Sequence, residues 1–110
     1  MPDGPLTSAQ FHILLTLVSG QRHGYGIMQE IENRTGGAVE LGPGTLYRSI
    51  KQLLAKGLIV EIQGTPDPGR QRRTYALTEV GKARTAEEAR QLRDLARWVE
   101  ETTVLQGTGQ

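Results

Sequence analysis

The chain has 110 residues, of which 23% are charged and 36% hydrophobic, and its formal net charge is +1. This composition excludes wholesale disorder and fits one globular domain with a modest core, which gains from a partner subunit. The absence of cysteine excludes a disulfide scaffold and a cysteine-based zinc site. No apolar run approaches the roughly 20 residues that span a bilayer, and no basic leader precedes the first apolar segment, so we expect a cytoplasmic protein without a membrane anchor.

Positive charge gathers in the middle of the chain. Residues 64–84 hold five Lys/Arg against two Asp/Glu, whereas residues 1–63 hold five of each and residues 85–110 hold three against five. Such an asymmetry can orient a protein on a polyanion even when its net charge is close to zero.

Two helices are predicted in the first third of the chain. The first covers about residues 7–18 and is apolar around so much of its circumference that one side should face its own domain and another a second subunit. A turn is expected at residues 22–26, and the second helix runs from there to about Thr35. Residues 39–41 are expected to form an extended link or one strand of a small sheet.

The stretch from Gly42 to Gly57 has the signals of a helix at both of its ends. Pro43 suits the first helical turn, and Gly57 suits the left-handed residue just past the end. Apolar residues recur on one face at helical spacing. The opposite face contains no Asp or Glu and consists of Gly44, Thr45, Arg48, Lys51, Gln52 and Ala55. A solvated helix usually mixes both signs of charge, so this face indicates a polyanionic partner, and we interpret the stretch as a DNA recognition helix.

A β-hairpin should follow, with strands over residues 58–63 and 70–77 and a turn-rich segment between them. A hairpin after a helix-turn-helix is a wing, and its arginines would clamp phosphate groups rather than read bases. The fourth helix, over residues 78–102, would be roughly 37 Å long and outreach the small domain before it. Its apolar seam needs a partner, and a second copy is the simplest one.

The fold class predicted from these elements is mostly α with a small β-hairpin wing, a winged helix-turn-helix plus a long C-terminal dimerisation helix. We therefore divide the chain into a winged-helix DNA-binding domain over residues 1–77, a dimerisation helix over residues 78–102 and a disordered tail over residues 103–110.

Several short motifs follow one another along the chain: His23-Gly24-Tyr25, Glu30-Ile31-Glu32, Thr35-Gly36-Gly37, Pro43-Gly44-Thr45-Leu46-Tyr47, Leu53, Gly57-Leu58-Ile59, Arg73-Thr74-Tyr75 and Leu77-Thr78-Glu79-Val80-Gly81. In residues and order they resemble the motifs of PadR-type winged-helix transcriptional regulators, in particular the small members of that family. The resemblance implies a homodimer in which the C-terminal helix packs on the partner's first helix, DNA binding by the third helix and the wing, and repression relieved by a small ligand. Gly26 departs from the pattern, because larger residues such as Glu are common there.

Candidate functional residues follow from these elements. The candidate DNA-binding residues are Tyr25, Thr45, Tyr47, Arg48, Lys51, Gln52, Arg70, Arg72 and Arg73. Arginine pairs well with guanine and glutamine with adenine in the major groove, whereas the two tyrosines could instead pack between helices. The candidate dimer interface consists of Phe11, Leu14, Leu15, Leu92, Leu95, Ala96 and Val99.

The single tryptophan, Trp98, lies beside the seam, where two copies would either sandwich a flat ligand or pack against each other. His12 and His23 lack a supporting carboxylate pattern, so we expect no metal site, and no catalytic constellation or cofactor motif is present. We predict a sequence-specific transcriptional regulator of double-stranded DNA. It would be a homodimeric repressor on a pseudo-palindromic operator, relieved by a small aromatic or hydrophobic effector. The alternatives are a winged-helix module for protein–protein interaction and a non-specific nucleic-acid binder.

Overall fold

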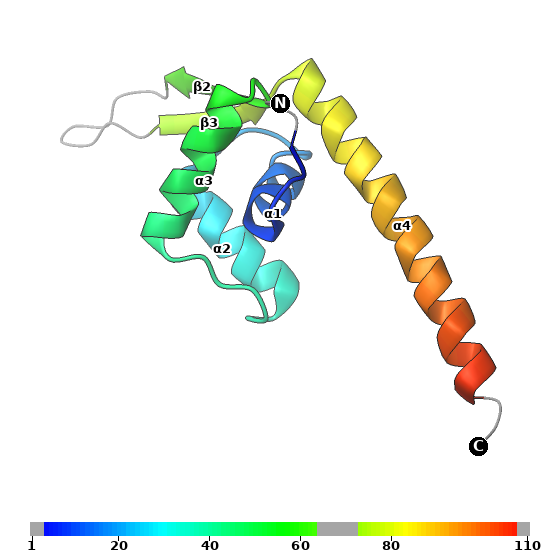
Figure 1. Cartoon of the computed structure of the whole chain (residues 1–110). Coiled ribbons are helices and arrows are strands. Elements are labelled where there is room, and N and C mark those ends of the chain that lie inside the picture. Colours follow the sequence, from blue (N-terminus) through cyan, green and yellow to red (C-terminus); the bar gives the residue numbers. More distant parts are fainter. Residues whose placement is uncertain (1–3, 64–72, 108–110) are drawn as a thin grey trace.

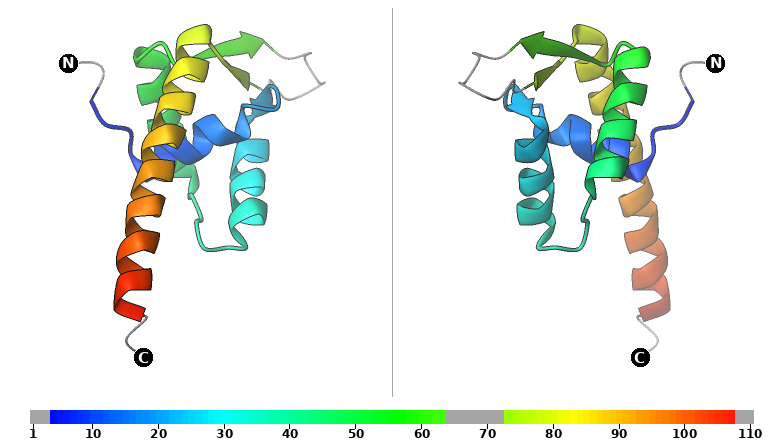
Figure 2. Two further views of the ribbon diagram at one scale, coloured as in Figure 1. Left: turned by 90° about the vertical axis from the view of Figure 1, so that its right-hand side faces the viewer. Right: turned by 90° about the vertical axis from the view of Figure 1, so that its left-hand side faces the viewer.

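The computed structural model describes residues 4–63 and 73–107 and confirms a mostly helical fold with a small sheet. Its elements are α1 (Ser8–Thr16), β1 (Arg22–His23), α2 (Gly24–Thr35), α3 (Pro43–Ala55), β2 (Ile59–Gln63), β3 (Arg73–Leu77) and α4 (Glu79–Gly107). The antiparallel sheet has the strand order β1-β3-β2. Helix α1 lies at the centre, in contact with α2, α3 and α4 (Figure 1). Helix α4 runs along one side of this body and extends beyond it (Figure 2).

Local hydrogen bonds explain where the helices begin. At the start of α1, Thr7 and Gln10 form a capping box, in which each side chain accepts a hydrogen bond of 3.1 Å from the other's backbone N–H. At the start of α4, the Thr78 hydroxyl accepts one from the Gly81 N–H at 2.9 Å. Helix α3 ends before Gly57, whose φ of 72° is the left-handed conformation expected there.

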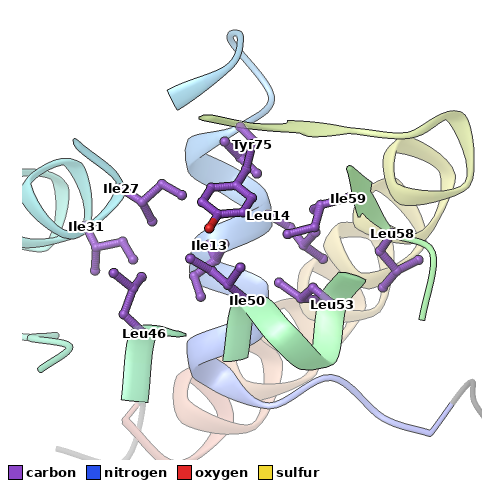
Figure 3. Packing of buried hydrophobic residues seen from close by; sticks show 11 residues of the cluster. Ile13, Leu14, Ile27, Ile31, Leu46, Ile50, Leu53, Leu58, Ile59 and Tyr75 are labelled. Atoms are coloured by element: carbon purple, nitrogen blue, oxygen red, sulfur yellow. The ribbon is translucent and has the colours of Figure 1, made fainter. Parts of the chain in front are cut away.

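One hydrophobic core joins α1, α2, α3 and the sheet. Its buried members are Ile13, Leu14, Leu17, Ile27, Ile31, Leu46, Ile50, Leu53, Leu58, Ile59 and Tyr75. Figure 3 shows the Tyr75 ring among the aliphatic side chains, with its hydroxyl directed into the cluster. Burial raises the pKa of this phenol. The core fixes the position of α3, since three of its residues are almost completely buried: Leu46, Ile50 and Leu53.

The structure corrects three of the local predictions. The expected turn at residues 22–26 contains the short strand β1, whose Arg22 pairs with Tyr75 of β3, and the start of α2. Residues 39–41 form no strand. The predicted tail begins too early, because α4 continues to Gly107, while residues 108–110 lie outside the described residues.

Helix α4 has two different halves. Its first turns pack on the body, where Thr85 is buried and the Arg84 guanidinium donates a hydrogen bond of 3.2 Å to the Gly4 carbonyl. A methyl group at Gly81 would lie only 1.9 Å from the Leu58 carbonyl oxygen, so the backbones approach closely at this point. From residue 90 to residue 103, by contrast, every residue is exposed. The second half of α4 therefore touches little of its own subunit.

Candidate nucleic-acid interface

Helix α3 presents its predicted polar face to solvent. Gly44, Thr45, Arg48, Lys51, Gln52 and Ala55 are all exposed, on the side opposite the buried leucines and isoleucine. Within residues 4–63 and 73–107, neither Arg48 nor Lys51 forms an ion pair with a carboxylate. Among these described residues, the face thus combines positive charge without a carboxylate partner with small residues that allow close approach of a ligand.

The two tyrosines flank this face and differ in their contacts. Tyr25 is 61% exposed at the start of α2, and Tyr47 is 51% exposed on α3. A methyl group built at Gly24 would lie 2.7 Å from the Tyr47 hydroxyl oxygen, so the Tyr47 ring rests directly on Gly24. Tyr47 therefore packs between α3 and α2 while half of its surface stays accessible. This arrangement is compatible with both roles considered for Tyr47, which are packing between helices and contact with DNA.

Gly26, the position that departs from the family pattern, has a local explanation. The His23 ring accepts a hydrogen bond from the Gly26 N–H at 3.3 Å through Nδ1 and caps α2. A methyl group at Gly26 would lie 2.9 Å from that same nitrogen. Glycine at this position leaves room for the histidine cap and so fits the start of α2, beside Tyr25.

The wing is described only in part. Arg73 is exposed, and its guanidinium lies 4.0 Å from the Glu61 carboxylate on the neighbouring strand, which partly balances its charge. The other two candidate clamps, Arg70 and Arg72, lie outside the described residues.

Gln52 makes a contact that its position in the sequence does not reveal. Its side-chain oxygen accepts a hydrogen bond of 2.8 Å from the Gln10 amide nitrogen of α1, 42 positions away. The Lys56 ammonium donates to the Gln10 side-chain oxygen at 3.4 Å. Neither Gln10 nor Lys56 was among the predicted site residues, because nothing local in the sequence pairs the N-terminus of α1 with α3.

The candidate dimer residues divide into a surface set and one exception. Leu15, Leu92, Leu95, Ala96 and Val99 are exposed, and Phe11 is partly buried. Leu14, however, has 0% exposure and belongs to the core of its own subunit, so its assignment to an interface is wrong. Val18, two residues after the end of α1, is exposed instead. Trp98 is 67% exposed on the projecting half of α4.

A cavity of about 410 Å³ lies between α1 and α2, beside the exposed Leu15 and Val18. Its rim includes Glu30, whose carboxylate accepts a hydrogen bond of 2.9 Å from Arg34. That bond, together with the positive charges of Arg34 and Arg22, lowers the pKa of Glu30 below its ordinary value of 4.5. No helix among the described residues is long and apolar enough to cross a membrane.

Two short helices are followed by a third helix with an exposed basic face and by a β-hairpin. These elements define a winged helix-turn-helix protein. The chain belongs to the Transcriptional regulator PadR-like family, whose model matches residues 13–87. The family is one of transcriptional regulators, which is not a class of enzymes.

Individual relatives agree with this membership. The chain is 37% identical over 92 residues to Transcriptional regulator Rv3488 of Mycobacterium tuberculosis, which covers 84% of this chain and 82% of that protein. A PadR family regulator from Clostridium difficile R20291 has the same fold, with a TM-score of 0.75 at 23% identity over 86% of this chain and 97% of its own. Bacillus subtilis PadR, solved in complex with operator DNA, gives a TM-score of 0.70 at 22% identity over 77% of this chain and 48% of its own.

Proposed function

We propose that this chain regulates transcription by sequence-specific binding to double-stranded DNA, as a homodimeric repressor on a pseudo-palindromic operator. The observation that carries the proposal is the acid-free face of α3, which stands on a helix held rigidly by the core. Bacillus subtilis PadR, which shares this fold, was solved in complex with operator DNA, and this supports DNA binding by the present chain. Such a regulator works in the cytoplasm, where the chromosome is.

In this proposal, Arg48, Lys51 and Thr45 enter the major groove on α3. Arg48 has the planar fork that matches the two acceptors of guanine, and Lys51 supplies a point charge for an acceptor or a phosphate. Tyr25 lies beside them and offers a hydroxyl to the backbone. The arginines of the wing add phosphate contacts that increase affinity without reading sequence.

The dimer follows from the projecting half of α4. Four of its large apolar side chains are exposed in the single subunit: Leu92, Leu95, Trp98 and Val99. An exposed apolar surface of this kind is typical of an interface. On the body, Leu15 of α1 and Val18, just after α1, are also exposed. In a two-fold arrangement the α4 seam of one protomer covers α1 of its partner and holds the two α3 helices about 34 Å apart.

The two-fold axis would also bring two copies of Trp98 near one another. An indole that is two-thirds exposed in the subunit offers a flat apolar surface for a small aromatic or hydrophobic effector. Binding there would change the angle between the protomers and shift the population whose α3 helices match the operator spacing.

A gel shift with the DNA upstream of the protein's own gene tests this proposal. Specific retardation that survives excess unrelated DNA is the expected result, and Arg48→Ala should abolish it while Arg90→Ala on α4 should not. Equal binding to all sequences would favour a non-specific nucleic-acid binder. No retardation at all would favour a protein–protein interaction module.

A further inference from the structure

A chain of partly buried hydrogen bonds links the start of α1 to the exposed face of α3. Its centre is Gln10, a polar side chain that is only 3% exposed. The Gln10 oxygen accepts from the Thr7 backbone N–H at 3.1 Å and from the Lys56 ammonium at 3.4 Å. The Gln10 nitrogen donates to the Gln52 oxygen at 2.8 Å.

The bond from the Thr7 backbone N–H determines the donor and the acceptor in the other bonds of this chain. A backbone N–H can only donate, so the Gln10 atom that faces Thr7 must be its oxygen. The nitrogen of the same amide then faces Gln52, and the Gln52 atom opposite it must be an acceptor, its oxygen. The amide orientation of Gln52 thus follows from the helix cap of α1.

This orientation turns the Gln52 oxygen toward Gln10 and leaves the Gln52 nitrogen as a free donor among the described residues. The Gln10 oxygen already accepts two hydrogen bonds, and the Gln52 oxygen accepts one from a buried group. The Gln52 amide nitrogen donates to no other group within the described residues, and Lys56, one helical turn further on, adds an ammonium group with no carboxylate partner there. A side with free donors and positive charge suits an anion.

The same geometry argues against base reading by Gln52. A glutamine recognises adenine by donating to N7 with its nitrogen and accepting from N6 with its oxygen, and it needs both atoms. The bond to Gln10 takes one of the two acceptor positions of the Gln52 oxygen and holds the amide toward α1. The pairing of Gln52 with adenine that the sequence favours would have to use the remaining acceptor position or break this bond.

We propose that Gln52 and Lys56 form a binding site for one phosphate of the DNA backbone, and that Gln10 is the positioning residue that turns the Gln52 amide toward it. The inference rests on the proposed function, since it assigns a role within the same DNA complex. It changes Gln52 from a base reader into a backbone contact and brings Gln10 and Lys56 into the interface.

The central test replaces Gln52 with glutamate, because Gln52→Glu keeps an acceptor for Gln10 but presents a negative charge where the phosphate would lie. Affinity for the operator and for an unrelated duplex should fall by the same factor, roughly tenfold to hundredfold, because a hydrogen bond to a charged group is lost. The base preferences in a selection from random DNA should stay unchanged. A changed preference at one base pair, or an unchanged affinity, would overturn the assignment.

The positioning role of Gln10 has its own test. Gln10→Leu should weaken binding to both duplexes, and adding Gln52→Ala to it should cause no further loss, because Gln10 acts through Gln52. Additive losses would contradict this role. If Gln10→Leu folds poorly by circular dichroism, Gln10→Glu serves instead, since it retains the cap on Thr7 and forces the Gln52 nitrogen inward. An affinity equal to wild type in Gln10→Glu would then reject the role.

Lys56 provides a third readout that identifies the phosphate. Lys56→Gln should make the slope of log K against log salt about 1.8 shallower in a dimer, since each neutralised phosphate contributes about 0.9. A single neutral methylphosphonate can be placed in turn at each phosphate position of both half-sites. At one position only, it should weaken DNA binding by wild type and leave DNA binding by Lys56→Gln unaffected. No such position would overturn the site. If wild type binds no DNA, the proposed function fails; if wild type binds and these variants behave like it, only this inference fails.

Discussion

Replacing Leu95 with glutamate should separate the proposed dimer. Leu95 is 49% exposed in the single subunit, on the half of α4 that touches little else in the described chain. Burying a whole leucine contributes about 1.5–3 kcal/mol, so covering its exposed half contributes roughly 0.75–1.5 kcal/mol. A two-fold dimer covers it twice, which gives about 1.5–3 kcal/mol and a dimer dissociation constant roughly tenfold to 150-fold higher. The buried charge of glutamate would weaken the dimer further.

Sedimentation equilibrium over a concentration series measures this change directly. Arg97→Glu is the matched control, because Arg97 is two residues further on and lies on the opposite side of the helix. Circular dichroism should show that both variants keep a folded body. A dimer constant for Leu95→Glu equal to that of wild type would refute the seam as the interface.

Three further variants test the α3 face, the α4 junction and a helix ion pair. Lys51→Gln should make the slope of log K against log salt for operator binding about 1.8 shallower, because a dimer loses two lysine side chains that contact the DNA. Gly81→Ala should destabilise the fold by about 3 kcal/mol or more in urea unfolding, because its methyl group would meet the Leu58 carbonyl oxygen at 1.9 Å. Glu30→Gln should lower stability at neutral pH, because the hydrogen bond from Arg34 holds the pKa of this carboxylate down and so stabilises the fold. A carboxylate whose pKa is lowered in the folded state contributes stability only while it is ionised. The difference in stability between Glu30→Gln and wild type should therefore disappear as the pH falls below about 4.5.

Each of these variants has a control or a contradicting result. Lys82→Gln changes a lysine that pairs with Glu79 on α4, and it should leave the salt dependence unchanged. Gly44→Ala places a methyl group where nothing lies within 4 Å, so it should be neutral or stabilise the fold by about 0.4–1 kcal/mol. A stability difference for Glu30→Gln that stays constant down to pH 3 would contradict the role of the carboxylate charge.

Both limits of α3 and the start of α4 were predictable because their signals are local. Pro43 and Gly57 set the ends of α3, and Thr78 caps α4, as residues within one turn of each helix end require. The polar face of α3 was also predictable, since helical spacing decides which residues share a side.

The side on which each neighbour packs was not predictable. Helix α1 is apolar around most of its circumference, and spacing alone does not say which side meets the core. The core takes Ile13, Leu14 and Leu17, so Leu14 was misassigned, while Leu15 and Val18 remain outside.

Contacts between segments far apart in the chain were also not predictable, because they depend on how the elements pack. Strand β1 exists only because Arg22 and His23 pair with β3, which lies far along the chain, and two residues carry no strand periodicity of their own. The bond between Gln10 and Gln52 likewise depends on how α1 and α3 pack.

Selection of binding sites from random DNA by the wild-type protein tests sequence-specific DNA binding by a dimer. The enriched sequences should contain two inverted half-sites whose centres lie about one helical turn, roughly 34 Å, apart, because two α3 helices read them together. Enrichment of a single half-site would contradict the dimeric readout. No enrichment over the starting pool would contradict sequence-specific DNA binding itself.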